Sequence, residues 1–252
     1  MRILATNDDG YTSMGIKILV KKLREAGHTV TILAPDRERS CSSHAMTSII
    51  SPISIQQIDE GTWSCTGTPA DCALVGLSKD FGFLPELVVS GINSGSNLGI
   101  DVHYSGTVAA ARQAALHRVP AIAFSLCAFR APFYFENAAQ WAAARLDELA
   151  ALWSENIFIN VNFPNKEALP ASYELCCLSG QRYKDAIIMR KENGKSRYNC
   201  EFAFNGFTDE IYEKSDRYAI VTGKIAVTPV LLEQFSTVEA KPVPKLFQEG
   251  AD

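Results

Sequence analysis

The sequence has no long hydrophobic run and no excess of positive charge. No apolar stretch approaches the roughly 20 residues that a membrane-spanning helix needs, so we expect no membrane anchor. With 24 basic and 28 acidic side chains the net charge is −4, which argues against broad binding to nucleic acid. This net charge does not exclude a local site for an anionic ligand. In the first residues (MRILATNDDG) a short apolar run is followed at once by two acidic residues, so we expect no cleaved leader.

Cysteine and histidine are few, and they are not spaced as metal ligands. The seven cysteines contain no C-x-x-C pair, and the four histidines show no ligand spacing with one another or with the cysteines. We therefore expect no zinc site. An odd, scattered set of cysteines is typical of reduced thiols, so we expect a cytoplasmic protein.

The chain does have enough apolar sequence for a substantial core. Of its 252 residues, 47% are hydrophobic and 21% are charged, which excludes wholesale disorder. A chain of this length fits one large α/β domain, or a domain with an appendage.

The first part of the sequence predicts a βαβ unit. Residues 2–6 form a short apolar run, residues 14–26 carry apolar side chains at helical spacing, and residues 29–33 form a second apolar run. Two strands joined by a helix in this way are parallel, with a right-handed crossover. Further strands are expected at 87–90, 121–126 and 157–161, extended structure at 48–58, and helices at 68–77, 108–116 and 135–152.

Beyond Pro164 the pattern changes to short extended segments separated by glycine and asparagine. We expect a parallel-dominated α/β core over residues 1–165, a β-rich appendage over 166–230 and a tail over 231–252. Within the appendage, strands are expected at 174–178, 186–190, 197–204 and 224–228, with a hairpin turn near Gly194.

Two adjacent acids, Asp8 and Asp9, stand at the end of the first strand, before Gly10. Like charges at the end of a buried strand repel, and a divalent cation resolves that conflict. A solvated turn with a capping aspartate is the plain alternative. Because the carboxyl ends of parallel strands share one edge of the sheet, Ser40 and Asn93 could converge with the acids. Such an all-oxygen set suits Mg²⁺ or Mn²⁺, and it could activate a water beside a phosphoryl group, with one carboxylate as general base.

Two glycine-containing segments fit an anionic substrate. The stretch 91–99 (GINSGSNLG) lets backbone N–H groups approach a ligand, although it is no Walker A loop. Ser105, Gly106 and Thr107 open a helix, where exposed amides favour phosphate, with ordinary capping as the alternative. His44 could orient a group or protonate a leaving alkoxide, and a surface or capping histidine is the alternative.

Six motifs, in this order, are similar to those of the survival protein E (SurE) family of 5'/3'-nucleotidases. They cover most of the chain and are densest before residue 125. The motifs are NDDG at 7–10, APDRERS at 34–40, TGTPADC at 66–72, SGINSGSNLG at 90–99, YSGTV at 104–108 and VTP at 227–229.

The resemblance implies a Rossmann-like three-layer α/β core. It also implies one divalent cation (Mg²⁺ or Mn²⁺) per subunit and hydrolysis of nucleoside 5'- and 3'-monophosphates by metal-activated water. Homodimers or homotetramers are implied, with the appendage exchanged between subunits. By the motif match the metal ligands are Asp8, Asp9, Ser40 and Asn93, the first two also being catalytic. The phosphate-site residues implied are Asn97, Ser105, Gly106, Thr107 and His44.

Two other functions fit parts of the pattern. A signalling receiver also has an acidic pair that binds Mg²⁺, but it needs a phosphoacceptor aspartate after a later strand, where this chain has Asn93. A nucleotide-binding module without catalysis would bind nucleotide tightly and release no phosphate.

Overall fold

The structure is a computed structural model that describes residues 1–192, 196–208 and 211–232. Within these residues a nine-stranded sheet has the order β3-β4-β2-β1-β5-β6-β7-β11-β8, and β9 and β10 form a separate two-stranded sheet. The strands of the large sheet are β1 (Arg2–Thr6), β2 (Thr29–Pro35), β3 (Ile55–Asp59), β4 (Thr62–Cys65), β5 (Leu87–Ser94), β6 (Ala121–Cys127), β7 (Ile157–Pro164), β8 (Tyr173–Leu175) and β11 (Ile225–Leu231).

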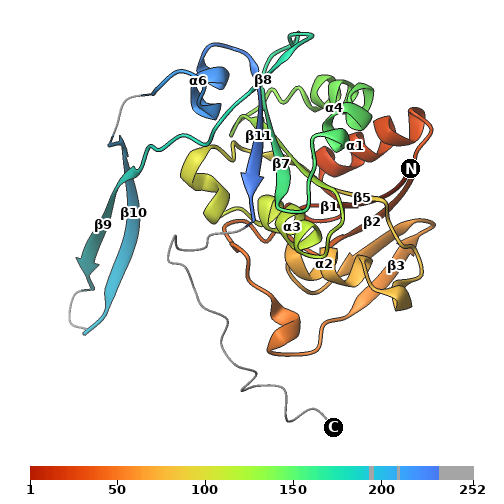
Figure 1. Ribbon diagram of the computed structural model, residues 1–252. Helices are drawn as coiled ribbons and strands as arrows, with labels where there is room; N and C mark the ends of the chain where they lie inside the picture. The colour runs from red at the N-terminus through yellow and green to blue at the C-terminus, as the bar shows by residue number, and fades with distance from the viewer. Residues whose placement is uncertain (193–195, 209–210, 233–252) are drawn as a thin grey trace, which may run out of the picture.

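Helices cover both faces of this sheet (Figure 1). Side chains alternate along β1, so that Ile3 and Ala5 pack in the cluster under α1 and α4, and Leu4 packs in the cluster under α2 and α3. The expected three-layer, Rossmann-like α/β core is confirmed. The helices are α1 (Met14–Glu25), α2 (Pro69–Gly76), α3 (Gly106–Leu116), α4 (Phe135–Ala144), α5 (Leu146–Ala151) and α6 (Asp216–Val221), with 3₁₀ turns η1 (Thr47–Ile49), η2 (Lys79–Phe81) and η3 (Gly99–His103).

The predicted βαβ unit is confirmed. Strands β1 and β2 are parallel, with Ile3 opposite Val30. The apolar spacing of α1 faces the sheet, where Ile16 and Leu19 are fully buried, each contributing roughly 1.5–3 kcal/mol. Gly27 follows the helix with φ of +88°, a conformation in which glycine has no Cβ clash.

The chain changes direction across the sheet between β1 and β5. Strands β2 and β4 lie on one side of β1, and β5, β6 and β7 continue on the other side. All these strands are parallel to their neighbours, so their carboxyl ends share one edge. Open α/β sheets bind ligands outside the carboxyl ends at such a switch point. The topology therefore predicts a ligand site among the loops after β1, β2 and β5.

Strand β5 is longer than the predicted strand at 87–90, because it continues through Asn93 to Ser94. Its register against β6 shifts between Ser90 and Asn93. Gly91 permits this bulge, since its φ is +127° and a Cβ there would lie 2.2 Å from the carbonyl oxygen of Phe124. Asn93 therefore projects from the end of a strand rather than from a loop.

The prediction of a single helix at 135–152 is wrong. The chain forms α4 and α5, and Arg145 between them has the non-helical angles φ −121° and ψ 13°. The Arg145 guanidinium lies 5.1 Å from the Trp141 ring centroid and donates to the carbonyl of Ala171. A side chain held by two neighbours fixes the break, which a helical apolar pattern does not reveal.

The C-terminal part contributes to two sheets. The antiparallel ribbon of β9 (Tyr183–Lys191) and β10 (Tyr198–Phe207) projects away from the body (Figure 1). Strand β11 runs antiparallel to β7 and parallel to β8, so both β8 and β11 belong to the large sheet. The division of the chain after residue 165 stays a prediction. Helix α6 was not predicted, and the Gly194 turn and residues 233–252 of the predicted tail lie outside the described residues.

All seven cysteines are free. None of the helices in the described ranges is both long and apolar enough to cross a membrane.

Candidate active site

The turn after β1 is built by Asn7, which is fully buried. Its side-chain amide donates to the Gly10 carbonyl at 3.0 Å and to the Ser13 hydroxyl at 2.8 Å, and its Oδ1 accepts the Gly10 N–H at 3.1 Å. Gly10 has φ of +94°. This closed turn fixes the backbone of Asp8 and Asp9 at the switch point, so the alternative of a freely solvated turn does not describe them.

Asp8 is held by the first turn of α3. Its Oδ1 accepts the Thr107 hydroxyl at 2.5 Å, and its Oδ2 accepts the Thr107 N–H at 3.1 Å. A Cβ on Gly106 would lie 2.9 Å from the Asp8 Cβ, so only glycine lets the carboxylate approach this closely. Burial raises the pKa of Asp8, and the bonds from Thr107 partly offset that effect.

Asp9 lies beside Asp8 and beside the end of β5. Burial, and then the charge of Asp8, raise its pKa to about 7, while the N–H of Ser94 donates to it and acts in the opposite direction. The charge of Glu38 raises the pKa further. Two neighbouring carboxyl groups, one buried and one half-buried, are costly as two anions, and a cation between them would remove that cost.

The loop after β2 lies against this pair. The N–H of Arg39 donates to the Asp8 carbonyl at 2.7 Å. The Ser40 hydroxyl donates to Glu38 Oε1 at 2.7 Å, so in this structure it faces the loop's own acid. Among the described residues no group bonds to the buried Ser42 hydroxyl, whose oxygen lies 2.9 Å from where a Gly106 Cβ would stand. Nothing in the sequence around Ser42 predicts a role for it at this site.

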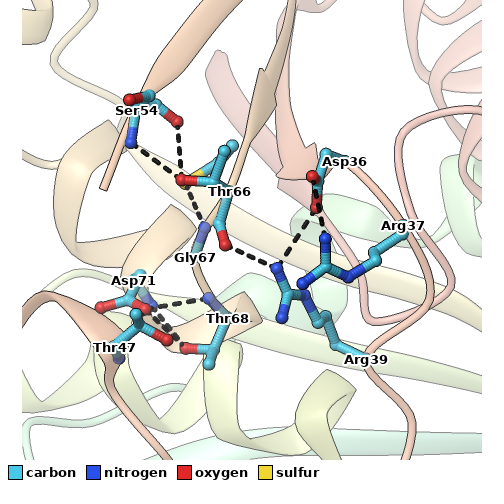
Figure 2. A network of polar contacts seen from close by, with 10 residues as sticks. Asp36, Arg37, Arg39, Thr47, Ser54, Thr66, Gly67, Thr68 and Asp71 are labelled. Carbon is cyan, nitrogen blue, oxygen red and sulfur yellow. Dashed lines mark hydrogen bonds and ion pairs between the residues drawn. The ribbon is translucent and has the colours of Figure 1, made fainter. Parts of the chain in front are cut away.

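The two arginines of that loop are committed elsewhere. Figure 2 shows Arg39 between Asp36, at 3.3 Å, and the Thr66 carbonyl, at 2.5 Å. Arg37 also pairs with Asp36, at 3.5 Å. Nearby, Asp71 caps α2 by accepting the N–H of Thr68 at 2.9 Å. Through Arg39 these contacts brace the loop on the segment before α2, whereas the Arg37 side chain is exposed.

Asn93 completes the candidate set from β5. Its Nδ2 donates to the Gly95 carbonyl at 3.0 Å, which leaves Oδ1 as the side-chain atom available to a hard cation. Its neighbour Ser94 contacts Asp9. The end of β5 and the turn after β1 therefore meet as predicted, whereas the metal roles of Asp8, Asp9, Ser40 and Asn93 stay predictions.

Asn97 ties the glycine-rich loop to the next two strands. Its Nδ2 donates to the Ser125 hydroxyl at 2.7 Å, and its N–H donates to Asn162 Oδ1 at 2.9 Å. Its carbonyl accepts from Asn160 at 2.8 Å and from Asn162 at 3.0 Å. These bonds give Asn97 a scaffolding role in addition to its predicted phosphate contact.

The start of α3 holds the side chain of Asp8 in this structure. Ser105 caps the helix by accepting the Val108 N–H at 3.1 Å, while Thr107 binds Asp8 through its hydroxyl and N–H. The predicted phosphate contacts of Ser105, Gly106 and Thr107 would have to form alongside these bonds. They stay predictions.

His44 is half-buried and is held by α3. Its Nε2 lies 2.8 Å from Gln113 Oε1, and Gln113 Nε2 lies 3.1 Å from His117 Nε2. Burial lowers the pKa of His44 below its usual 6.5, which favours the neutral ring at pH 7. A substrate contact through its other ring nitrogen stays a prediction.

The residues present fit a divalent cation. The pKa values of Asp8 and Asp9 are raised, so a nearby positive charge would stabilise their carboxylates. Two further oxygens, the Ser42 hydroxyl and Asn93 Oδ1, could bind a hard cation. Within the described ranges no three histidines, cysteines or acids form a metal-binding group. The candidate donors are carboxylate, amide and hydroxyl oxygens, the hard type that Mg²⁺ and Mn²⁺ accept.

Comparisons with known proteins find relatives over most of the chain. The sequence model of the family described as survival protein SurE matches residues 3–185. A 5'-nucleotidase SurE of Treponema pallidum is 45% identical over 174 residues, which is 67% of this chain and 92% of the relative. A 5'-nucleotidase SurE of Pelobacter propionicus is 39% identical over 236 residues, which is 92% of this chain and 94% of the relative.

A solved structure has the same fold. The SurE protein from Aquifex aeolicus superposes with a TM-score of 0.80 at 31% sequence identity, over 93% of this chain and 95% of that chain. The predicted resemblance is confirmed, and the chain belongs to the survival protein SurE family.

Proposed function

We propose that this protein is a metal-dependent phosphomonoesterase that hydrolyses nucleoside 5'- and 3'-monophosphates to nucleoside and phosphate. The observation that carries the proposal is the Asp8–Asp9 pair at the switch point, in which the buried Asp8 contacts the first turn of α3. Relatives at 39% and 45% identity carry the name 5'-nucleotidase, which supports nucleotides as the substrate class.

The proposed cation ligands are the carboxylates of Asp8 and Asp9, the amide oxygen of Asn93 and the hydroxyl of Ser40. One Mg²⁺ or Mn²⁺ per subunit would balance the two carboxylates. When bound, such a cation supplies the charge that lowers the pKa of a water and polarises a phosphoryl oxygen. The Ser40 hydroxyl would have to turn from Glu38 to join the set.

The remaining proposed roles belong to side chains and to one helix end of the protein. Thr107 orients Asp8 through two bonds, and the positive end of α3 attracts the phosphate. Asp9, through a carboxylate oxygen not committed to the cation, is the proposed proton acceptor as the water oxygen attacks phosphorus and the bond to the nucleoside oxygen breaks. The proposed phosphate-site residues are Asn97, His44, Ser105, Gly106 and Thr107.

The function is tested by phosphate release from 5'- and 3'-monophosphates with Mg²⁺, with Mn²⁺ and with a chelator. We expect release that the chelator stops, and a loss of at least about 100-fold in Asp8→Asn and in Asp9→Asn, the scale of removing a general base. Asp80→Asn, an exposed change in η2, is the matched control.

A thermal readout separates metal binding from turnover. Mn²⁺ at about 100 times its Kd should raise the midpoint of unfolding by roughly 5–10 °C in the wild type and in Asp80→Asn. Asp9→Asn should lose most of that shift while staying folded. Full activity in Asp8→Asn or Asp9→Asn would overturn the assignment, and tight nucleotide binding without phosphate release would indicate a binding module instead.

We also propose a cytoplasmic homodimer or homotetramer that associates through residues 166–230. The seven free cysteines support the location. The projecting β9–β10 ribbon supports the association, because a two-stranded ribbon alone is marginally stable in water.

A further inference from the structure

An open surface hollow lies at the same edge of the sheet, beside the candidate site. Its volume is about 550 Å³, within the range typical of small-molecule pockets. The loop after β6 and the loop after β7 line it, with Phe129, Arg130, Asn165 and Lys166 among the lining residues. The strands end there in the same direction as β1 and β5.

Phe129 joins this hollow to the candidate metal site. Its Cε1 lies 2.9 Å from where a Cβ on Gly95 would stand, so the edge of the ring rests on the Gly95 backbone. The Gly95 carbonyl accepts from Asn93 Nδ2, and the Gly95 N–H donates to the Leu126 carbonyl at 3.0 Å. Phe129 therefore contacts Gly95, which in turn is hydrogen-bonded to the proposed metal ligand Asn93.

The Phe129 side chain is 78% exposed. Within the described part of the chain no other aromatic ring stacks on it, whereas Phe133 and Phe135 stack on each other. Single exposed apolar side chains are common and need no function. This one is unusual in its place, because it stands in a pocket and touches the loop of the candidate site. An open ring face there is a stacking surface for a planar ligand.

The polar groups of the pocket are mainly donors. Asn165 is occupied at both ends, because its Oδ1 accepts the Tyr134 N–H at 3.0 Å and its Nδ2 donates to the Pro132 carbonyl at 2.7 Å. The Lys166 ammonium is directed over Gly223, at the end of α6. Arg130 is exposed, and among the described residues it has no ion pair. The pocket thus offers one aromatic face and one free guanidinium.

We propose that this hollow is the nucleobase subsite, in which Phe129 stacks on the base and Arg130 reads its acceptor edge. The inference rests on the proposed function, since it assigns the other end of the nucleotide whose phosphate binds near Asp8. A guanidinium forms paired hydrogen bonds with the O6 and N7 acceptors of guanine or hypoxanthine, whereas adenine has a donor at the corresponding position. The preferred substrate is therefore a 6-oxopurine nucleotide.

The stacking role is tested by comparing guanosine 5'-monophosphate with ribose 5-phosphate, which lacks the base. In Phe129→Ala we expect kcat/KM for the nucleotide to fall roughly 5- to 150-fold, the range for loss of one base–aromatic stack, and kcat/KM for the sugar phosphate to stay unchanged. Phe129→Trp should restore the nucleotide value. Leu116→Ala, which shortens another exposed apolar side chain at the far end of α3, is the control.

The reading role is tested by the ratio of kcat/KM for guanosine and adenosine 5'-monophosphates. Arg130→Ala should reduce a wild-type preference for guanosine roughly 5-fold or more, and Arg130→Lys should not restore it, because an ammonium lacks the paired donors. An unchanged ratio would overturn the role of Arg130. Equal losses on ribose 5-phosphate would show that Arg130 serves the phosphate, which also overturns it.

The two proposals fail in different ways. If the wild type releases phosphate from neither compound with Mg²⁺ or Mn²⁺, the proposed function is wrong. If the wild type hydrolyses both, and Phe129→Ala changes both by the same factor or changes neither, the nucleobase subsite is wrong while the phosphatase activity stands.

Discussion

At the scale of single residues, the position of Asp8 depends on Thr107. A fully buried hydroxyl and a backbone N–H of one residue hold both carboxylate oxygens. Charge-assisted hydrogen bonds of this kind are stronger than neutral ones, and they fix the orientation of the acceptor. Thr107 is therefore a positioning residue for the acid pair, and the same contact that orients Asp8 also stabilises the fold.

We expect Thr107→Val to lower the free energy of unfolding by roughly 1–3 kcal/mol, because it leaves a buried carboxylate oxygen without its donor at nearly unchanged volume. Denaturant unfolding measures the change. Thr107→Ser keeps the hydroxyl and serves as the control. If Thr107→Val were as stable as Thr107→Ser, the contact would contribute no net stability.

At the scale of elements, buried acids connect α6 to the structure around the site. Asp216, at the start of α6, accepts the N–H of Gly99 at 2.7 Å and of Ser179 at 2.9 Å. Asp101 in η3 accepts the Leu98 N–H and the hydroxyl of Tyr183 in β9, and it lies 3.8 Å from Arg217. The glycine-rich loop is thereby anchored to the base of the projecting ribbon.

These contacts predict a pH dependence of stability. Burial raises the pKa of Asp101 from 3.8 to about 6, although the Leu98 N–H and Arg217 act in the opposite direction. Between pH 4 and pH 6 Asp101 is therefore more protonated in the folded than in the unfolded chain, and its contribution to stability falls as pH rises through this window. Burial also raises the pKa of Asp216, which adds to the same trend.

Asp101→Asn should flatten this fall, by no more than about 3 kcal/mol between pH 4 and pH 6. Urea unfolding at several pH values measures the slope, which is independent of any constant loss of stability in the variant. Asp80→Asn removes an exposed carboxyl outside these contacts and is the control. Parallel curves for the wild type and Asp101→Asn would contradict the raised pKa.

At the scale of the whole molecule, the ribbon of β9 and β10 has one mainly apolar face, which also carries Asp185 opposite Phe204. Phe202 stands opposite Ile187, and by strand alternation Met189 and Phe204 lie on the same side. Their exposed fractions run from 53% to 63%. An apolar face of this kind on an isolated ribbon favours burial against another chain.

We expect the wild type to sediment as a dimer or a tetramer of the 27.6 kDa chain, and Phe202→Asp to sediment mainly as a monomer. A charge in the apolar face opposes burial. Ile188→Asp makes the same change on the opposite face of the ribbon and should keep the assembly. A monomeric wild type, or equal masses for the two variants, would exclude this face as the contact.

The sequence by itself determined the local structure near the N-terminus and the family of the chain. The start of α2 was readable because Thr68 and Asp71 cap it reciprocally, and the β1–α1–β2 unit was readable because the apolar spacing in each segment matches its own period. The switch point follows from parallel strands, so the meeting of Asp8 and Asp9 with the end of β5 was predictable.

Only the tertiary structure decided which groups satisfy the acids. Thr107 is distant from Asp8 in sequence, yet its hydroxyl and its N–H both bind that carboxylate. The break at Arg145 and the contact of Phe129 with Gly95 likewise join segments with no local signal. The spacing of apolar residues and the capping of helices depend on residues that are close together in the sequence. Burial and the pairing of charges depend on segments that meet only after folding.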